Sequence, residues 1–239
     1  METEEIREKK EPKRLPVWAC ILLFALGLFV CMGLYGTIGF GLLSLILGDE
    51  ARHPGLLVYT VTEANMLLSV LTPAVILLYF ERRPFSDLGL TLKGHVRGLW
   101  YGLLVAMLLY LIGFGLSLAI GEVEVTGFQF DPLNLLGTFV FCLLVALTEE
   151  IMMRGYILGR LLHTRMNKFL ALFVSALLFA LLHIFNPNVA FLPMLNLVIA
   201  GMLIGASYLY TRNLCFPISL HLFWNWIQGP ILGYQVSGN

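Results

Sequence analysis

The sequence predicts an all-α fold, a polytopic transmembrane helix bundle of about seven spans. Of its 239 residues, 59% are hydrophobic and only 13% are charged, whereas soluble domains carry about 25% charged residues. The mean hydropathy is +0.85. The apolar residues are gathered into runs about as long as the roughly 20 residues that a helix needs to cross a bilayer. This composition and its patterning exclude an ordinary soluble protein.

Seven apolar runs divide the chain, and because the first and fourth are long enough to hide a break, the count lies between six and eight. The run over 15–47 exceeds the 7–15 residues of a signal-peptide apolar region, so we expect it to stay in the protein as a helix. A turn signal, Asn186-Pro187-Asn188, separates the fifth run from the sixth. The predicted spans cover residues 17–45, 56–80, 96–120, 133–160, 168–186, 189–210 and 214–235.

These spans predict a single transmembrane domain over residues 15–235. Residues 1–14 mix glutamate, lysine and arginine and are expected to form a polar cytoplasmic tail. Residues 236–239 form a short C-terminal tail.

The basic residues of the connecting segments predict a cytoplasmic N-terminus. With the N-terminus inside, thirteen lysines and arginines fall on the cytoplasmic side and only Arg52 falls on the opposite side. The acidic residues Glu122, Glu124 and Asp131 also lie on that opposite side. Cytoplasmic loops carry an excess of lysine and arginine, so this bias favours seven spans with the C-terminus outside. The thirteen are Arg7, Lys9, Lys10, Lys13, Arg14, Arg82, Arg83, Lys93, Arg97, Arg160, Arg165, Lys168 and Arg212.

Cysteines and glycines indicate helix packing rather than cross-linking. The four cysteines lie singly in apolar runs without a CxxC pair, which argues against a disulfide framework or a thiolate zinc site. Glycine pairs at four-residue spacing let helix backbones approach closely, and we interpret them as packing within one bundle. The cysteines are Cys20, Cys31, Cys142 and Cys215, and the pairs are Gly98/Gly102, Gly155/Gly159 and Gly201/Gly205.

The stretch most costly to place in a membrane is Glu149-Glu150 with Arg154, inside the fourth apolar run. An ionisable side chain at bilayer depth costs about 2.5–3.5 kcal/mol on insertion scales, so such residues usually have a function. Positions i and i+4 of a helix share a face, whereas neighbours lie about 100° apart. We therefore expect Glu150 to pair with Arg154 and Glu149 to point elsewhere, free for another task. The alternative is that both acids make structural contacts between helices.

Two more polar pairs lie in later apolar runs. Phe179 and His183 share a face near the end of the fifth span, where the phenyl ring can buttress the imidazole. His221 and Asn225 share a face in the last span, and both side chains make directed hydrogen bonds. Taken alone, each pair also fits a structural role.

Together, the motifs supply four groups from three helices that are costly to bury unless they meet around a hydrated cavity. The four are Glu149, His183, His221 and Asn225. Such a set suits hydrolysis, since a carboxylate takes a proton from water, one imidazole orients the water, and the other with the amide holds the oxyanion.

The same inventory leaves a metal open. Glu149, His183 and His221 resemble part of a zinc shell, so a divalent metal such as zinc is an alternative cofactor. The sequence lacks HExxH, which excludes a conventional zincin, and no serine, threonine or cysteine lies in a recognisable nucleophile motif.

The motifs EExxxR at 149–154, FxxxH at 179–183 and HxxxN at 221–225 resemble those of the CPBP family. That family groups the CAAX prenyl endopeptidases of the Rce1 type with bacterial Abi relatives, some linked to bacteriocin self-immunity. The spacing, the order and the placement on successive apolar segments all match. The stretch at 85–90 also looks like family members. The resemblance covers about 85–235, and residues 1–80 add two spans without a signature.

The resemblance implies an intramembrane endopeptidase with its site in a cavity of the bundle. By position, Glu149 would activate water with help from His183. His221 and Asn225 would stabilise the tetrahedral intermediate.

The resemblance also implies that Glu150 and Arg154 lock the helix geometry, and Phe179 joins them as a supporting residue. Family members are described both as metalloproteases and as metal-independent glutamate proteases. The residues favour water activation by Glu149, because no third strong metal ligand is obvious.

Two other functions suit the same residues. One is a non-catalytic immunity or scaffold protein on this fold, and the other is a small transporter, against which the lack of an internal repeat counts. The expected partners are membrane lipid and a membrane-associated peptide or protein substrate, with no nucleic acid. We expect the chain in the plasma membrane of a bacterium.

The predicted span limits also predict how deep the polar side chains lie in the membrane. They place Glu149 near the midplane, His183 nearer the outer end and His221 nearer the inner end of their spans. At 1.5 Å per residue, this separates the groups by about 10 Å or more along the membrane normal.

Overall fold

The computed structural model describes residues 15–187 and 190–234, which are all-helical apart from turns and connecting loops. The predicted tails at 1–14 and 236–239 lie outside the described residues. The α-helices are α1 (Val17–Leu47), α2 (Leu56–Phe80), α3 (Val96–Ala119), α4 (Pro132–Glu150), α5 (Gly159–Leu161), α6 (Lys168–Leu182), α7 (Phe191–Thr211) and α8 (Cys215–Trp226). Short 3-10 helices, η1 (Gly48–Arg52) and η2 (Phe85–Leu88), and π-helices, η3 (Ile151–Leu158) and η4 (Ile227–Ile231), connect or extend them.

Each predicted span coincides with a helix, but two helices are shorter than expected. Within the described residues, five segments are long and apolar enough to cross a membrane: Val17–Arg52, Leu56–Phe80, Val96–Ala119, Pro132–Leu161 and Phe191–Thr211. Helix α6 has 15 residues, and α8 with η4 ends at Ile231. The predicted spans 168–186 and 214–235 were therefore too long. The chain is an integral membrane helix bundle.

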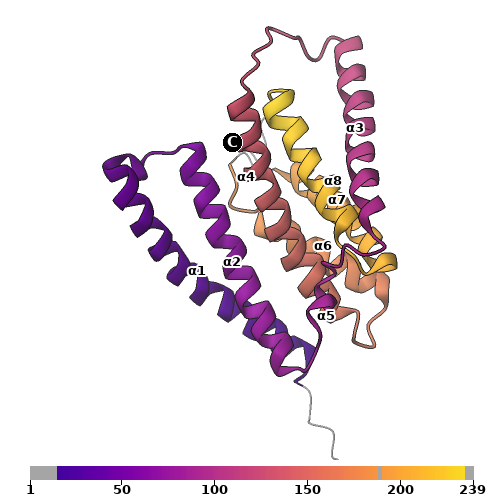
Figure 1. Cartoon of the computed structure of the whole chain (residues 1–239). Helices are drawn as coiled ribbons and strands as arrows, with labels where there is room; N and C mark the ends of the chain where they lie inside the picture. Colours follow the sequence, from indigo (N-terminus) through magenta and orange to yellow (C-terminus); the bar gives the residue numbers. More distant parts are fainter. Residues whose placement is uncertain (1–14, 188–189, 235–239) are drawn as a thin grey trace, which may run out of the picture.

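Helix α4 occupies the middle of the bundle (Figure 1). It packs against α2 on one side and against α8 on the other. The outer layers are α1 against α2 and α3 against α8, while α6 and α7 pack on each other and contact η3. The continuous segment Pro132–Leu161 therefore touches most of the other helices.

The start of α4 is set by a local cap. The Asp131 side chain accepts hydrogen bonds from the backbone N–H groups of Leu133 and Asn134, each at 3.1 Å, and Pro132 occupies the first turn. An acidic N-cap followed by proline satisfies the free N–H groups of a first helical turn. From this start, the helix delivers Glu149 and Glu150 to its last two positions.

The predicted glycine pairs pack within the bundle. A Cβ at Gly102 of α3 would lie 2.6 Å from the Leu220 backbone nitrogen of α8, and one at Gly201 of α7 would lie 3.1 Å from the Ala176 Cβ of α6. A Cβ at Gly155 would lie 2.8 Å from the Leu88 carbonyl oxygen. Because these contacts join elements of one chain, the interpretation of close packing inside the bundle is confirmed.

An ion-pair network fastens the end of α2 to α5. Arg160 contacts the Glu81 carboxylate and lies 3.9 Å from Asp87. Arg83 lies 3.3 Å from Glu81 and 3.2 Å from Asp87. Arg160, at the end of the predicted span 133–160, was counted among the cytoplasmic charges, yet it is only 4% exposed. Its guanidinium pairs with acidic side chains inside the protein. Spacing along the chain could not predict these partners.

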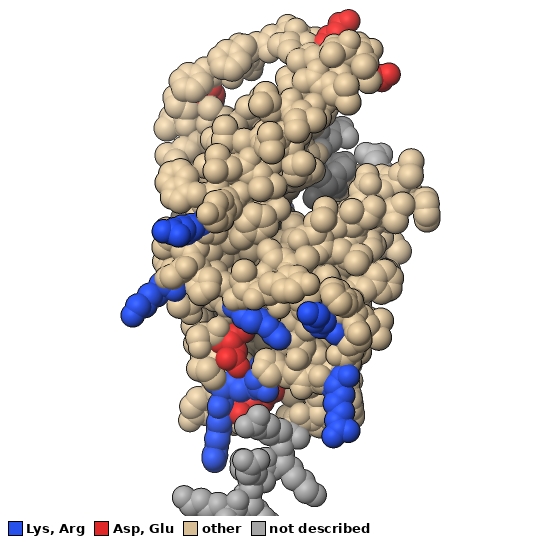
Figure 2. Space-filling model, turned by 90° about the vertical axis from the view of Figure 1, so that its right-hand side faces the viewer, with Lys and Arg blue, Asp and Glu red and all other residues tan. Residues whose placement is uncertain are grey.

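Charged side chains are segregated on the surface (Figure 2). Lysine and arginine side chains gather over the lower half of this view together with some acidic ones, whereas the charged side chains visible at its upper end are acidic. The surface between is largely free of charge, in keeping with a belt of exposed apolar residues such as Trp100, Leu111 and Ile112 on α3. This separation agrees with the loop charges from which the orientation was predicted.

Candidate active site

The polar cluster in the bundle is built around Glu150, the last residue of α4. Its side chain is 0% exposed, and the Arg154 side chain is 1% exposed. Arg154 Nη1 donates to Glu150 Oε1 at 2.9 Å, and Nη2 donates to the Gly201 carbonyl at 3.3 Å. The predicted pair of Glu150 with Arg154 is therefore present and buried.

Glu150 has a second partner that was not predicted. His221 Nδ1 lies 2.8 Å from the same Oε1 atom, so one carboxylate oxygen joins α4, η3 and α8. Carboxylate oxygens only accept hydrogen bonds, so Nδ1 of His221 carries the proton and its Nε2 faces the other way. Glu150 thus orients the imidazole as well as the helix.

Glu149 lies between the two histidines. Its Oε1 is 3.8 Å from His183 Nε2, and its Oε2 is 3.7 Å from His221 Nε2. Oε2 is buried and makes no hydrogen bond within the described residues. Polar atoms at these separations, with one oxygen unpaired, leave room for a bridging water.

His183 is oriented by its own helix. Its Nδ1 lies 2.9 Å from the Phe179 carbonyl oxygen, an acceptor, so Nδ1 carries the proton and Nε2 faces Glu149. The Phe179 ring lies near both imidazoles, with its centroid 4.8 Å from that of His183 and 6.4 Å from that of His221. The Arg154 guanidinium covers the same ring at 4.5 Å from its centroid. Phe179 therefore buttresses His183, as predicted, and also joins it to Arg154.

The expected depth mismatch is wrong. Glu149, His183 and His221 approach within 3.8 Å of one another in two pairs rather than lying about 10 Å apart. Because α6 ends at Leu182 and the chain turns there, His183 caps a short helix and reaches the level of Glu149. The α8 helix places His221 by its close crossing with α4.

Asn225 is the least engaged of the four residues expected to carry the chemistry. It is half-buried one turn beyond His221, and no hydrogen bond joins it to Glu149, His183 or His221 within the described residues. Its amide remains available to a ligand.

The fit to a metal is poor in this arrangement. Within the residues that the structure describes, no group of three or more histidine, cysteine, aspartate or glutamate side chains is placed to hold a metal ion. His221 uses Nδ1 for Glu150, and the Nε2 atoms of His221 and His183 lie 3.7 and 3.8 Å from different oxygens of Glu149. The chemistry below is therefore derived from the side chains alone.

The backbone changes its winding at the site. Directly after Glu150 the helix continues as the π-helix η3, which carries Arg154. π-Helical turns are rare and frequently mark functional sites, because the extra residue per turn redirects side chains. The sequence predicts an ordinary α-helix here. The residue types of this segment do not indicate the π-helical winding.

Two polar groups near the site were missed. Glu63 of α2 lies beside the Thr148 hydroxyl and within electrostatic range of Glu149. Thr148 Oγ1 is buried and makes no hydrogen bond in the described part of the chain. The cost of an acid within an apolar run, which drew attention to Glu149, was a signal for Glu63 as well.

A comparison with protein families identifies the segment that carries this cluster. The family model for type II CAAX prenyl endopeptidase Rce1-like proteins matches residues 131–227. The matched segment begins at the α4 cap and includes all seven predicted site residues, but not Glu63. No curated protein and no solved structure matches the chain significantly.

Proposed function

We propose that the chain is a member of the Rce1-like family, whose model matches its residues 131–227, and that it is an intramembrane endopeptidase that uses a water activated by Glu149. The observation that supports this proposal is the Glu149 carboxylate, flanked by two imidazole nitrogens at 3.7 and 3.8 Å with one buried oxygen unpaired. A protease-type enzyme on this scaffold agrees with the family. The proposed substrate is a membrane-associated peptide or protein, and the proposed location is a bacterial plasma membrane.

In the proposed first step, a water lies among Glu149, His183 and His221. Both imidazoles present Nε2 to the site, because their Nδ1 atoms donate to Phe179 O and to Glu150. The water donates one hydrogen to Glu149 and is held by an imidazole, which leaves an oxygen lone pair for the substrate carbonyl. Glu149 takes the proton as the water oxygen bonds to the carbonyl carbon, a general-base step.

In the second step, the tetrahedral intermediate collapses. The carbon–nitrogen bond breaks, the proton held by Glu149 moves to the leaving nitrogen, and the products are a carboxylic acid and an amine. Asn225 offers an N–H donor to the oxyanion. His221 can donate from Nε2 only as the imidazolium, and the Glu150 carboxylate at Nδ1 supplies its counter-charge.

The test is cleavage by Glu149→Gln in proteoliposomes. Internally quenched, membrane-anchored peptides, in matched farnesylated and unmodified sets, report hydrolysis by fluorescence and cleavage position by mass spectrometry. We expect Glu149→Gln to lower kcat at least about 100-fold, because general-base catalysis contributes about 10²–10⁴-fold. Glu50→Gln, an exposed acid in η1, is the matched control and keeps full activity.

A chelator separates the two proposed modes of water activation. Activity that persists after treatment with 1,10-phenanthroline supports activation by Glu149 alone. Loss that zinc restores would replace this mechanism with a metal-assisted one. If no peptide is cleaved while all variants retain their fold, the non-catalytic alternative holds.

A further inference from the structure

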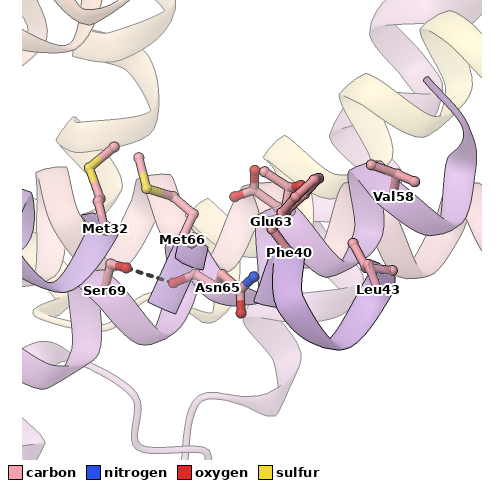
Figure 3. Close-up of a pocket in the computed structure, with 10 residues that line it drawn as sticks. Met32, Phe40, Leu43, Val58, Glu63, Asn65, Met66 and Ser69 are labelled. Carbon is pink, nitrogen blue, oxygen red and sulfur yellow. Dashed lines mark hydrogen bonds between the residues drawn. The ribbon is translucent and has the colours of Figure 1, made fainter. Parts of the chain in front are cut away.

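A second polar feature lies in the N-terminal part of the helix bundle, where the sequence has no family motif. A cavity of about 330 Å³ lies between α1 and α2, close to the lower end of the roughly 300–1,000 Å³ found for ligand pockets. Figure 3 shows Met32, Phe40, Glu63 and Met66 among the residues that line it. Its size suits one long side chain rather than a whole peptide.

The lining combines an apolar passage with one acid. Met32, Phe40, Val58 and Met66 supply apolar surface, and Glu63 supplies a carboxylate. Such a passage fits the aliphatic stem of a lysine or arginine, whose methylene groups pack on apolar surface while the head group finds a polar partner. The Phe40 ring adds a face that attracts a cation.

Glu63 has no cation of its own among the described residues. The ion pairs of residues 15–187 and 190–234 involve other acids. Another carboxylate, Glu149, lies within electrostatic range of it. An unpaired carboxylate inside a membrane protein is costly, and such residues mark substrate or ion pathways.

Glu63 connects this cavity with the candidate active site. Its carboxylate lines the cavity, and its side chain lies beside the Thr148 hydroxyl and within electrostatic range of Glu149. Thr148 is 2% exposed and directly precedes Glu149. A cation held by Glu63 therefore lies within reach of the carboxylate proposed as the base.

We propose that this cavity is a substrate subsite that takes a lysine or arginine side chain close to the scissile bond, with Glu63 as its anionic partner. The identification of the ligand as part of a substrate rests on the proposed endopeptidase function. The subsite itself is a binding site that can be measured without cleavage.

Binding is tested with the full-length protein in a non-ionic detergent. The probes are apolar peptides that carry one lysine, moved one position at a time, each paired with a peptide that has norleucine there. We expect the wild type to bind the best lysine peptide at least ten times more tightly than its norleucine partner, measured by fluorescence anisotropy. Glu63→Gln removes this preference, whereas Glu63→Asp and the control Glu50→Gln retain it.

Equal affinity for the paired peptides in the wild type overturns the subsite, as does an unchanged preference in Glu63→Gln. Repeating the titration with Glu149→Gln separates this inference from the proposed function. A retained preference in this variant, together with a wild type that cleaves none of the peptides, supports the subsite and contradicts the endopeptidase. Cleavage by the wild type without preference for a basic side chain contradicts the subsite alone. Where both hold, Glu63→Gln raises KM for the lysine substrate about ten-fold with kcat unchanged.

Discussion

Two adjacent glutamates at the end of α4 have different surroundings. Glu150 is fully buried and shares one oxygen between Arg154 and His221. Glu149 keeps a side chain that is 23% exposed and makes no direct hydrogen bond to either histidine. The same residue type is thus a fixed counter-ion at one position and an available base at the next.

Glu150→Gln tests this division. It leaves Arg154 without a buried counter-ion, and breaking a buried pair costs about 3–5 kcal/mol. We expect a large drop in the thermal unfolding midpoint in detergent together with loss of activity. Glu149→Gln serves as the comparison, because it abolishes activity while the unfolding midpoint stays close to that of the wild type. Equal midpoints for Glu150→Gln and the wild type would contradict the structural role of Glu150.

At the residue scale, local spacing predicted local partners. The i, i+4 rule identified Glu150 with Arg154 and Phe179 with His183, and both pairs are present. The contact between Glu150 and His221 spans 71 positions along the chain. Helix spacing contains no information about such a contact, which depends on how α4 and α8 cross.

Helix crossings hold the site at the element scale. The α3–α8 contact requires Gly102, because a Cβ there would lie 2.6 Å from the Leu220 backbone nitrogen, one residue before His221. On the same helix, a Cβ at Gly113 would meet nothing within 4 Å. An added methyl group would therefore clash with α8 at Gly102 and meet open space at Gly113.

Gly102→Ala is expected to disturb the α3–α8 contact and shift His221 relative to Glu149. Inserting a methylene into a packed contact costs about 1–3 kcal/mol, and a shift of about 1 Å at reacting groups lowers rates about 100-fold. Both the unfolding midpoint and the cleavage rate should therefore fall. Gly113→Ala, the matched control, should change neither. Loss of activity in both variants would contradict the crossing as the cause.

Helix ends and winding were the least predictable elements. Apolar runs predicted the seven long helical segments, of which α4, η3 and α5 together form one. The predicted span 56–80 matches α2 at both ends. Hydropathy continued past the point where α6 turns at His183, so the predicted span was too long. The π-helix η3 was missed because the local composition of residues 151–158 does not distinguish it from an α-helix.

At the scale of the whole molecule, charged residues have two separate roles. Buried networks such as Arg160 with Glu81 connect distant helices, while exposed basic residues set the orientation in the membrane. The prediction of a cytoplasmic N-terminus depends on the second group. The exposed residues Glu122, between α3 and α4, and Arg165, between α5 and α6, are expected on opposite sides.

Labelling of introduced cysteines tests this orientation. In a Cys31→Ser background the other cysteines, Cys20, Cys142 and Cys215, are buried, so a membrane-impermeant maleimide should report the new thiols alone. We expect Glu122→Cys to react in intact cells and Arg165→Cys to react only after the membrane is opened, because the basic loops stay on the cytoplasmic side. The unsubstituted background is the control. The reverse pattern would place the N-terminus outside and show that buried pairing, as at Arg160, had removed too many of the thirteen charges from the orienting set.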